Sequence, residues 1–302
     1  MKVSIIIPTF DRSDALLEVL AALSKQSFKD FEALVIDDGS YGHCANKKIT
    51  EDFCQLTIKY IYQSNAGPAA ARNLGLRNTA EQSEIVIFIG DDIIPHPDLI
   101  KQHVDFHFKY PEKKYAILGL TLWEESVRDQ FMDFLAPYGP QFNYSGKKSG
   151  DECDFRYLHT CNISFKKKLL QDIYFDEDFK IAAFEDTEFG YRLQKDRGFT
   201  IIYNPDAIGY HKHKYNRKQF IERQKKASLW AHVFVAKHQE AEPLVIKRWN
   251  KNLLYFAVWC CFSPLYLIRS ILPTQLEKKV YRYYNLAFFE LLFGWNYFIN
   301  KK

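Results

Sequence analysis

Three strand-like apolar runs lie in the first third of the chain; Pro8 ends the first, and the other two end in aspartate pairs. They are residues 3–7 (VSIII), 31–38 (FEALVIDD) and 84–92 (EIVIFIGDD). Short apolar runs without polar alternation are typical of parallel strands that are buried on both faces of a sheet. Amphipathic helical patterns lie between these runs, and further runs follow at 58–63 and 115–122. The sequence therefore predicts an α/β fold with a mostly parallel, doubly wound, Rossmann-like sheet.

The ends of the predicted strands form a candidate ligand site. In open α/β sheets, ligands bind beyond the carboxyl ends of the strands. The segment Pro8-Thr9, the pair Asp37-Asp38 and the pair Asp91-Asp92 would all meet at that edge. Adjacent carboxylates repel each other unless a cation joins them, and Mg²⁺ or Mn²⁺ binds such carboxylates together with phosphate oxygens and water. We expect a metal–diphosphate site at Asp91-Asp92; turn aspartates before the prolines that follow are the alternative.

The pattern loosens after residue 150. Residues 159–173 predict a strand followed by a helix, 184–198 a helix with acids first and bases last, and 199–213 a strand with a turn. Residues 217–239 predict a long basic amphipathic helix. We expect a domain over residues 1–215, with a nucleotide-binding half (1–100) and an acceptor half (101–215). A helical, aromatic-rich region would follow over residues 216–302.

Four motifs, in this order, resemble those of the family 2 glycosyltransferases with a GT-A fold. They are "VSIIIPTFDRSDALLEVLAALSKQSF", "FEALVIDDGS", "NAGPAAARNLGL" and "IVIFIGDDIIPHPDLI", with "FEDTEFGYRL" downstream. The resemblance covers residues 1–215. Members of that family move a sugar from a nucleotide-sugar to an acceptor with inversion at the anomeric carbon, usually with a divalent metal. It implies a nucleotide-sugar donor for this chain, UDP-linked by family habit, and a glycan or lipid-linked acceptor in surface polysaccharide assembly.

The resemblance also assigns roles to residues by their positions in these motifs. It implies nucleotide contacts at Pro8, Thr9, Phe10, Asp37, Asp38, Asn65, Gly67, Arg72 and Asp91, and metal ligands at Asp92 and His211. Arg72 would bond the base edge or the diphosphate, and an ordinary surface arginine is the alternative. The family's acid-x-acid triplet is Gly90-Asp91-Asp92 here. The missing first acid weakens the expected metal affinity, but the last acid, Asp92, is retained.

A second acid pair, Glu185-Asp186, matches the family's Glu-Asp motif. Inverting transfer requires a base that takes the proton of the acceptor hydroxyl. The resemblance implies that Asp186 is this base and that Glu185 orients the acceptor. The pair begins a predicted helix, where the helix dipole favours ionised carboxylates, so simple capping is the alternative. His211 and His213 lie in a basic cluster after the last strand; His211 would complete the metal shell, unless these histidines are structural.

Residues 253–268 form an uncharged, aromatic-rich segment near the carboxyl terminus. A membrane span requires about 20 apolar residues, and Pro264 interrupts this shorter run. Its aromatic residues and basic flanks favour a segment that lies in the interface of the cell membrane. A spanning helix, a buried hairpin and a dimer surface are the alternatives. The amino terminus lacks the pattern of a signal peptide, and the scattered cysteines indicate reduced thiols. We therefore expect a cytoplasmic protein, peripheral on the inner face of the membrane.

Two other classes of function compete with the enzyme. A non-catalytic protein that binds nucleotide-sugars or glycans could retain this fold, and Gly90 in place of an acid motivates that hypothesis. A nucleic-acid binder could use the basic residues 211–226. Basic residues (41) and acidic residues (37) are nearly balanced over the whole chain, and no nucleic-acid motif accompanies the basic segment. We expect no nucleic-acid partner.

Overall fold

The computed structural model describes residues 1–245 and 249–299. Contacts within the chain divide it into two compact units. Unit 1 comprises residues 1–128 and 144–213, and unit 2 comprises residues 129–143 and 214–302. The segment 129–143, which the sequence places in the amino-terminal domain, therefore groups with the carboxyl-terminal helices.

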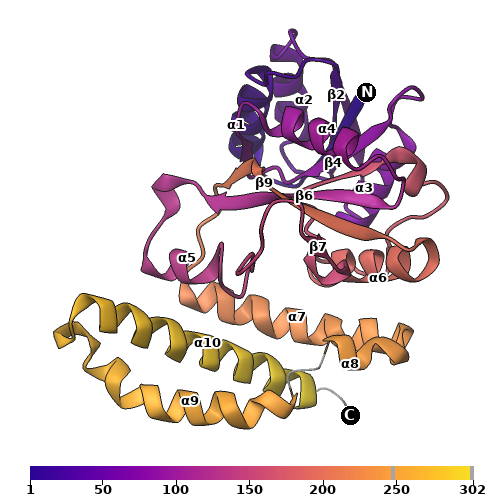
Figure 1. Cartoon of the computed structure of the whole chain (residues 1–302). Helices are drawn as coiled ribbons and strands as arrows, with labels where there is room; N and C mark the ends of the chain where they lie inside the picture. Colours follow the sequence, from indigo (N-terminus) through magenta and orange to yellow (C-terminus); the bar gives the residue numbers. More distant parts are fainter. Residues whose placement is uncertain (246–248, 300–302) are drawn as a thin grey trace. The chain divides into compact units, whose positions relative to one another are not determined.

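Unit 1 alternates strands and helices through its first half, as the periodicity predicts (Figure 1). Its strands are β1 (Val3–Thr9), β2 (Phe31–Asp38), β3 (Ile58–Gln63), β4 (Ile85–Ile89), β5 (Ile93–Pro95), β6 (Tyr115–Trp123), β7 (Glu152–Cys153), β8 (Asn162–Lys166) and β9 (Thr200–His211). Its α-helices are α1 (Ser13–Ser24), α2 (His43–Asp52), α3 (Pro68–Arg77), α4 (Leu99–Lys109) and α6 (Glu185–Arg197).

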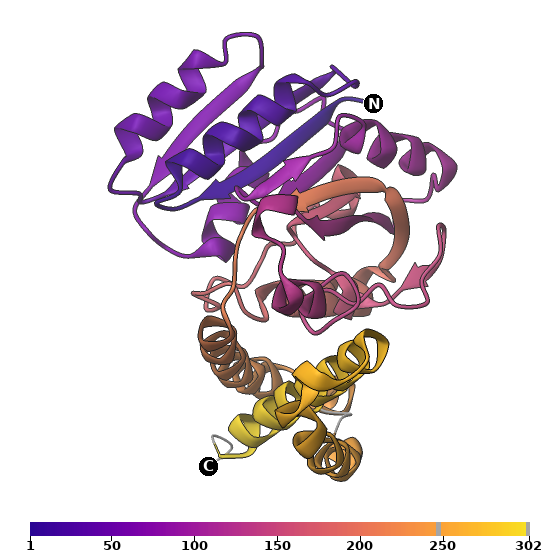
Figure 2. The ribbon, with the colours of Figure 1, turned by 90° about the vertical axis from the view of Figure 1, so that its left-hand side faces the viewer.

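The strands of unit 1 form one sheet in the order β3-β2-β1-β4-β8-β6-β9-β5, with β7 paired to β9. Parallel ladders join β1 to β2 and β4, β2 to β3, and β6 to β9, and they hold most of the paired residues. Figure 2 shows the amino-terminal strands, in indigo and purple, running in the same direction. The predicted fold class is confirmed. Strand β8 is antiparallel to both β4 and β6, and it pairs Asn162 with Ile89. The start of β8 therefore lies where β4 ends.

Helices cover both faces of this sheet. Alternate residues of β1, such as Ile5 and Ile7, belong to one apolar core with residues of α1 and α4. On the other face, α3 packs so closely that a Cβ on Gly75 would lie 2.5 Å from the Ile6 side chain. Helix α6 contributes to that second face through Phe189, whose ring stacks on Phe175 at 3.9 Å. Burial on both faces explains why the strands are apolar throughout.

Pro95, the first proline after Asp91-Asp92, belongs to a short edge strand, and Pro97 lies in the turn before α4. Strand β5 pairs antiparallel with the end of β9, in the register Ile93 to His211 and Pro95 to Gly209. It is the last strand of the sheet, which is where a proline costs no ladder hydrogen bond. This register brings the carboxylate pair next to His211, which lies about 120 residues further along the chain.

One local prediction was wrong, and one helix was missed. The helix expected within 159–173 is only a 3₁₀ turn, Lys167–Leu169, because Asp172 takes a left-handed φ of 58° that ends helical growth. Helix α2 was not predicted at all. Its buried positions include the polar residues Asn46 and Thr50, so its sequence lacks the apolar period that signals a helix.

Unit 2 is helical, with α5 (Gln130–Leu135), α7 (Arg217–Lys237), α8 (Glu242–Val245), α9 (Trp249–Leu267) and α10 (Thr274–Ile299). Its core is aromatic: Phe220 meets Phe289 edge-to-face at 5.0 Å, and Phe131 and Phe134 also contact Phe289. Helix α9 contains most of the segment 253–268. Among the helices that the structure describes, none has both the length and the apolar character required to cross a membrane.

A chain of buried hydrogen bonds fixes β8 against α4. Lys166 Nζ donates to His107 Nδ1 at 3.1 Å, and His107 Nε2 lies 2.9 Å from Ser164 Oγ. Ser164 Oγ lies 2.8 Å from His103 Nδ1, and His103 Nε2 lies 3.0 Å from Asn162 Oδ1. Because an ammonium only donates, one proton arrangement satisfies every member: each ring is neutral and carries its proton on Nε2. Burial lowers the pKa of His103 to about 4, which agrees with a neutral ring.

Replacing His103 by leucine should destabilise unit 1 strongly. The change removes the acceptor of the Ser164 hydroxyl proton and the donor to Asn162 Oδ1, and each such loss costs about 1–3 kcal/mol. Chemical denaturation should show a loss of about 2–5 kcal/mol. The control is Phe108→Ala on the same helix, where the side chain is exposed and the change should stay within about 0.5 kcal/mol. Equal stability of His103→Leu and the parent would contradict the network.

Candidate active site

The loops after β1, β2 and β4 meet at one edge of the sheet, because these strands are parallel and in register. Thr9, at the end of β1, donates its hydroxyl to Asp91 Oδ2 at 2.8 Å. Asp91 and Thr9 are both buried. The structure therefore brings together two residues that the sequence assigns to the nucleotide.

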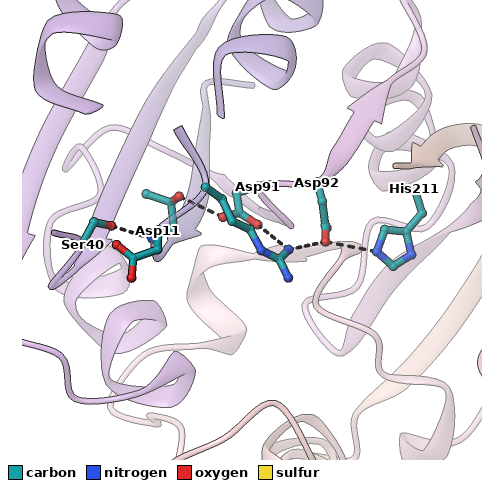
Figure 3. Close-up of polar contacts among 7 residues, drawn as sticks. Asp11, Ser40, Asp91, Asp92 and His211 are labelled. Carbon is teal, nitrogen blue, oxygen red and sulfur yellow. Dashed lines mark hydrogen bonds and ion pairs between the residues drawn. The ribbon is translucent and has the colours of Figure 1, made fainter. Parts of the chain in front are cut away.

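Asp92 lies between a guanidinium and an imidazole (Figure 3). Its Oδ2 is 2.5 Å from Arg12 Nη1 and 3.2 Å from His211 Nε2. The same Arg12 nitrogen is 3.3 Å from Asp91 Oδ1. The Trp123 ring stacks on His211, with centroids 5.1 Å apart. The predicted neighbours Asp92 and His211 are thus in contact.

The two adjacent carboxyls titrate in opposite directions. Burial raises the pKa of Asp91 to about 6, and the charge of Asp92 adds to that effect. Burial acts in the same sense on Asp92, but His211 and Arg12 outweigh it and hold the pKa of Asp92 well below its usual range. As pH falls below neutral, Asp91 therefore takes up a proton first and Asp92 stays ionised.

Asp37 and Asp38, at the end of β2, hold two neighbouring loops in shape. Asp37 accepts hydrogen bonds from Ser40 N, Asn46 Nδ2 and Tyr60 Oη at 2.7–2.8 Å. These bonds lower its pKa although burial alone would raise it. Asp37 is completely buried, so it supports the loop rather than facing its surface.

Asp38 secures the segment that leads into α3. It accepts from the backbone N–H groups of Ala66 and Gly67 at 2.9 Å and from Gln63 Nε2 at 2.6 Å, and Asn65 Nδ2 donates to its backbone carbonyl. Gly67 has a φ of 96°, and a Cβ there would lie 2.7 Å from the carbonyl oxygen of Lys180. A glycine is required at this position.

The second acid pair is held by Arg72 and Thr160. Arg72 Nη1 lies 3.0 Å from Glu185 Oε1 and 3.7 Å from Asp186 Oδ1. Thr160 donates its backbone N–H and its hydroxyl to Asp186, each at 2.9 Å. Phe184, the residue before this pair, has a left-handed φ of 69°. Such conformations cost about 1–3 kcal/mol and persist where the surroundings enforce them, often at functional sites.

Glu185 and Asp186 differ in their access to solvent. The Glu185 side chain is 4% exposed and that of Asp186 is 22% exposed. Burial raises the pKa of Glu185 to about 7, the charge of Asp186 raises it further, and Arg72 opposes both. Of the two carboxyls, Asp186 is the one that a substrate hydroxyl could reach.

The segment Thr160-Cys161 joins the two acid pairs. Thr160 binds Asp186, and the carbonyl of Cys161 accepts from Gly90 N at 3.4 Å. Burial raises the pKa of the Cys161 thiol to about 12, and the nearby charges of Asp186 and Asp92 add to this effect, whereas Arg72 and a hydrogen bond with Thr121 oppose it. The two pairs therefore border one centre, a consequence of the antiparallel entry of β8.

The sequence of this chain matches the model of the glycosyl transferase family 2 over residues 4–174, which is more than half of its length. The chain belongs to that family. It is 27% identical over 308 residues to a chondroitin synthase of Escherichia coli, covering 89% of this chain and 44% of the relative. It is also 24% identical to an O-antigen chain rhamnosyltransferase of Salmonella typhimurium, covering 74% of this chain and 70% of the relative. The chain thus spans less than half the length of that chondroitin synthase.

Solved structures share the fold of this family 2 glycosyltransferase. TarS of S. aureus (residues 1–349, with UDP) has a TM-score of 0.58 at 19% identity, covering 100% of this chain and 92% of that one. A mannosyltransferase from Pyrobaculum calidifontis, in complex with GDP-Man and Mn²⁺, has a TM-score of 0.65 at 16% identity, covering 100% and 88%. The predicted GT-A fold is confirmed.

The fit of the site residues to a divalent cation can be judged from their chemistry. Among the residues that the structure describes, no three His, Cys, Asp or Glu side chains are arranged as a metal cluster. Mg²⁺ and Mn²⁺ at nucleotide sites, however, bind one or two protein donors and take the rest from phosphates and water. Asp92 and His211 are two such donors in contact with each other, and they fit a divalent cation.

The structure gives the surroundings of the other predicted residues and adds new ones. Arg72 lies against Glu185 and Asp186. Pro8 is partly buried in β1, and Phe10 is exposed just beyond it. Sequence reasoning missed Arg12 and Thr160. Their signal in the sequence is only positional: Arg12 follows the first strand and Thr160 precedes a later one, and neither position indicates which acid the residue contacts.

Glu185→Gln should gain stability relative to the parent as pH rises. The folded protein keeps a proton on Glu185 up to about pH 7, whereas the unfolded chain releases it near pH 4.5. Stability of the parent therefore falls between these values as pH rises, and glutamine removes that loss. Melting curves from pH 5 to pH 8 should show the difference growing by about 1–3 kcal/mol.

The control for this pH series is Glu51→Gln, at an exposed position, whose difference from the parent should not change with pH. A constant difference between Glu185→Gln and the parent from pH 5 to pH 8 would contradict the raised pKa of Glu185.

Proposed function

We propose that this chain transfers a sugar from a nucleotide-sugar to a glycan acceptor, with inversion at the anomeric carbon, in the synthesis of a surface polysaccharide. The observation that carries the proposal is the convergence of two acid pairs on Thr160-Cys161. One pair suits the donor diphosphate and the other suits the acceptor hydroxyl. The chondroitin synthase and O-antigen relatives support the product class, and the UDP complex of TarS supports a uridine carrier.

The donor would lie over the loops after β1, β2 and β4. Thr9, Phe10 and Asp38, with Pro8, Asn65 and Gly67 around them, would bound the base and ribose, and Asp37 would keep the loop in shape. Asp91, bonded to Thr9, would face the ribose and sugar. Asp92 and His211 would hold Mn²⁺ or Mg²⁺, which offsets the charge of the leaving diphosphate. The Mn²⁺ complex of the mannosyltransferase supports this cofactor.

Asp186 would accept the proton of the attacking hydroxyl. Inversion requires the acceptor to approach from the face opposite the diphosphate, and a carboxylate within hydrogen-bond reach makes the oxygen a better nucleophile. Thr160 holds both Asp186 oxygens in place. The Asp186 side chain is partly exposed, which leaves room for a substrate. Glu185, bound to Arg72, would orient the acceptor and fix the position of Arg72.

Asp186→Asn should abolish most turnover while nucleotide affinity holds. Loss of a positioned base typically costs about 10²–10⁴-fold in rate. Release of nucleoside diphosphate from a panel of UDP- and GDP-sugars measures turnover, and calorimetry measures the affinity. The control is Asp196→Asn, an exposed position on the same helix. Equal turnover of Asp186→Asn and the parent would contradict the assignment. A parent that binds nucleotide-sugars but turns over none would favour the non-catalytic binding protein.

We further propose that the α9–α10 connection binds an anionic membrane surface, where lipid-linked acceptors are presented. Leu267 is 81% exposed and Ile271 is 80% exposed at this connection. Arg269 lies between them, and Lys278 and Lys279 are exposed on the following helix. Apolar side chains flanked by bases suit the headgroup region of an anionic bilayer. This extends the expectation for 253–268 from the helix to its end.

The double variant Leu267→Ser/Ile271→Ser should lose binding to vesicles that contain phosphatidylglycerol. Burying two such side chains contributes about 1.5–3 kcal/mol each, so partitioning should fall at least tenfold. Tyr41→Ser, which removes an exposed aromatic ring from unit 1, should bind as the parent does. The difference in sedimentation between anionic and neutral vesicles gives the electrostatic contribution to membrane binding. A dimer surface would be favoured instead if the parent bound no vesicles and formed a concentration-dependent dimer that the double variant did not form.

A further inference from the structure

Arg12 occupies the centre of the carboxylate site, yet the proposed transfer gives it no role. Its Nη1 lies 2.5 Å from Asp92 Oδ2 and 3.3 Å from Asp91 Oδ1. The Asp92 oxygen that it contacts is the same one that faces His211 at 3.2 Å. One guanidinium thus contacts both carboxylates, and on Asp92 it contacts Oδ2, the atom that would also bind a metal beside His211.

The loop that carries Arg12 is built to hold it there. Asp11, the preceding residue, has a left-handed φ of 52°. Its N–H donates to Ser40 Oγ at 2.9 Å, and its Oδ1 accepts from Tyr41 N at 2.8 Å. Figure 3 shows Asp11 tied to Ser40 on one side of the carboxylates and His211 on the other. Because two bonds to the loop after β2 fix this turn, the direction of Arg12 is set by the fold.

The three charged partners differ in their access to water. The Arg12 side chain is 41% exposed, whereas those of Asp91 and Asp92 are 10% and 13% exposed. By turning outward, the Arg12 guanidinium can regain contact with water, so the cost of its departure falls on the buried carboxylates unless another cation takes its place. The buried carboxylates have no such freedom. Without a positive partner, they would repel each other or take up protons.

We propose that Arg12 stands in for the divalent cation when no nucleotide is bound, and yields its place on Asp92 when the cation binds. This inference rests on the metal site of the proposed function. Arg12 keeps two adjacent carboxylates close and charged without metal. A cation must displace Arg12, so the affinity for the cation alone is reduced. The diphosphate that arrives with the cation adds oxygen ligands and so restores the lost affinity.

The test measures Mn²⁺ binding by electron paramagnetic resonance, for the parent and for Arg12→Gln, without nucleotide. Arg12→Gln should bind Mn²⁺ about tenfold more tightly, which corresponds to about 1.4 kcal/mol. Arg12→Lys, which keeps the charge but not the planar fork, should fall between them. Arg156→Gln removes an exposed arginine that is paired with Asp154 elsewhere in unit 1, and it should match the parent.

Melting temperatures separate this role from a purely structural one. Arg12→Gln should melt below the parent in EDTA and recover most of the difference in Mn²⁺, because the cation replaces the lost guanidinium. A structural role would lower the melting temperature equally in both conditions and would contradict the inference, as would equal Mn²⁺ affinity of Arg12→Gln and the parent. Absence of Mn²⁺ binding by every variant, with UDP or without it, would instead contradict the proposed metal site.

Discussion

Compensation of buried negative charge is the physical constraint on which this site depends. Four carboxyl groups in two adjacent pairs lie around Cys161, in surroundings where an isolated charge costs several kcal/mol. Arg12 and His211 contact the acid pair at the end of β4. Arg72 and Thr160 bind the acid pair that begins α6. Within each pair, burial pushes one carboxyl, Asp91 or Glu185, toward its neutral form. That asymmetry lets one member of each pair take a chemical role.

The sheet supplies these compensating groups from distant parts of the chain. Parallel strands place the ends of β1 and β4 at one edge, which brings Arg12 to Asp92. The antiparallel strand β8 begins at the same edge and brings Thr160 to Asp186, while the β5–β9 ladder brings His211. The buried network of His103, Ser164 and Asn162 fixes β8 in turn. A polar chain inside the unit thereby determines the position of the candidate base.

The strands and both acid pairs could be predicted from the sequence because their signals are local. An apolar run followed by carboxylates predicts a buried strand with acids at its end, whatever the rest of the chain contains. The motif that contains Glu185-Asp186 is likewise contiguous in sequence. The partners could not be predicted, because they depend on register. Nothing near Arg72 in sequence indicates Glu185 as its partner, and Arg12 resembles any arginine at the start of a helix. Helix α2 was missed because its buried face contains Asn46 and Thr50, which break the apolar period.

The central claim is that the edge built around Asp92 binds the diphosphate of a nucleotide-sugar through a divalent cation. Calorimetric titration of UDP and GDP into the parent and into Asp92→Asn, each with and without Mn²⁺, tests it most directly. The account predicts that Mn²⁺ tightens binding of one nucleotide to the parent at least tenfold, a gain of about 1.4 kcal/mol, and that Asp92→Asn loses this gain. An equal gain in Asp92→Asn, or no nucleotide binding by the folded parent, would contradict it.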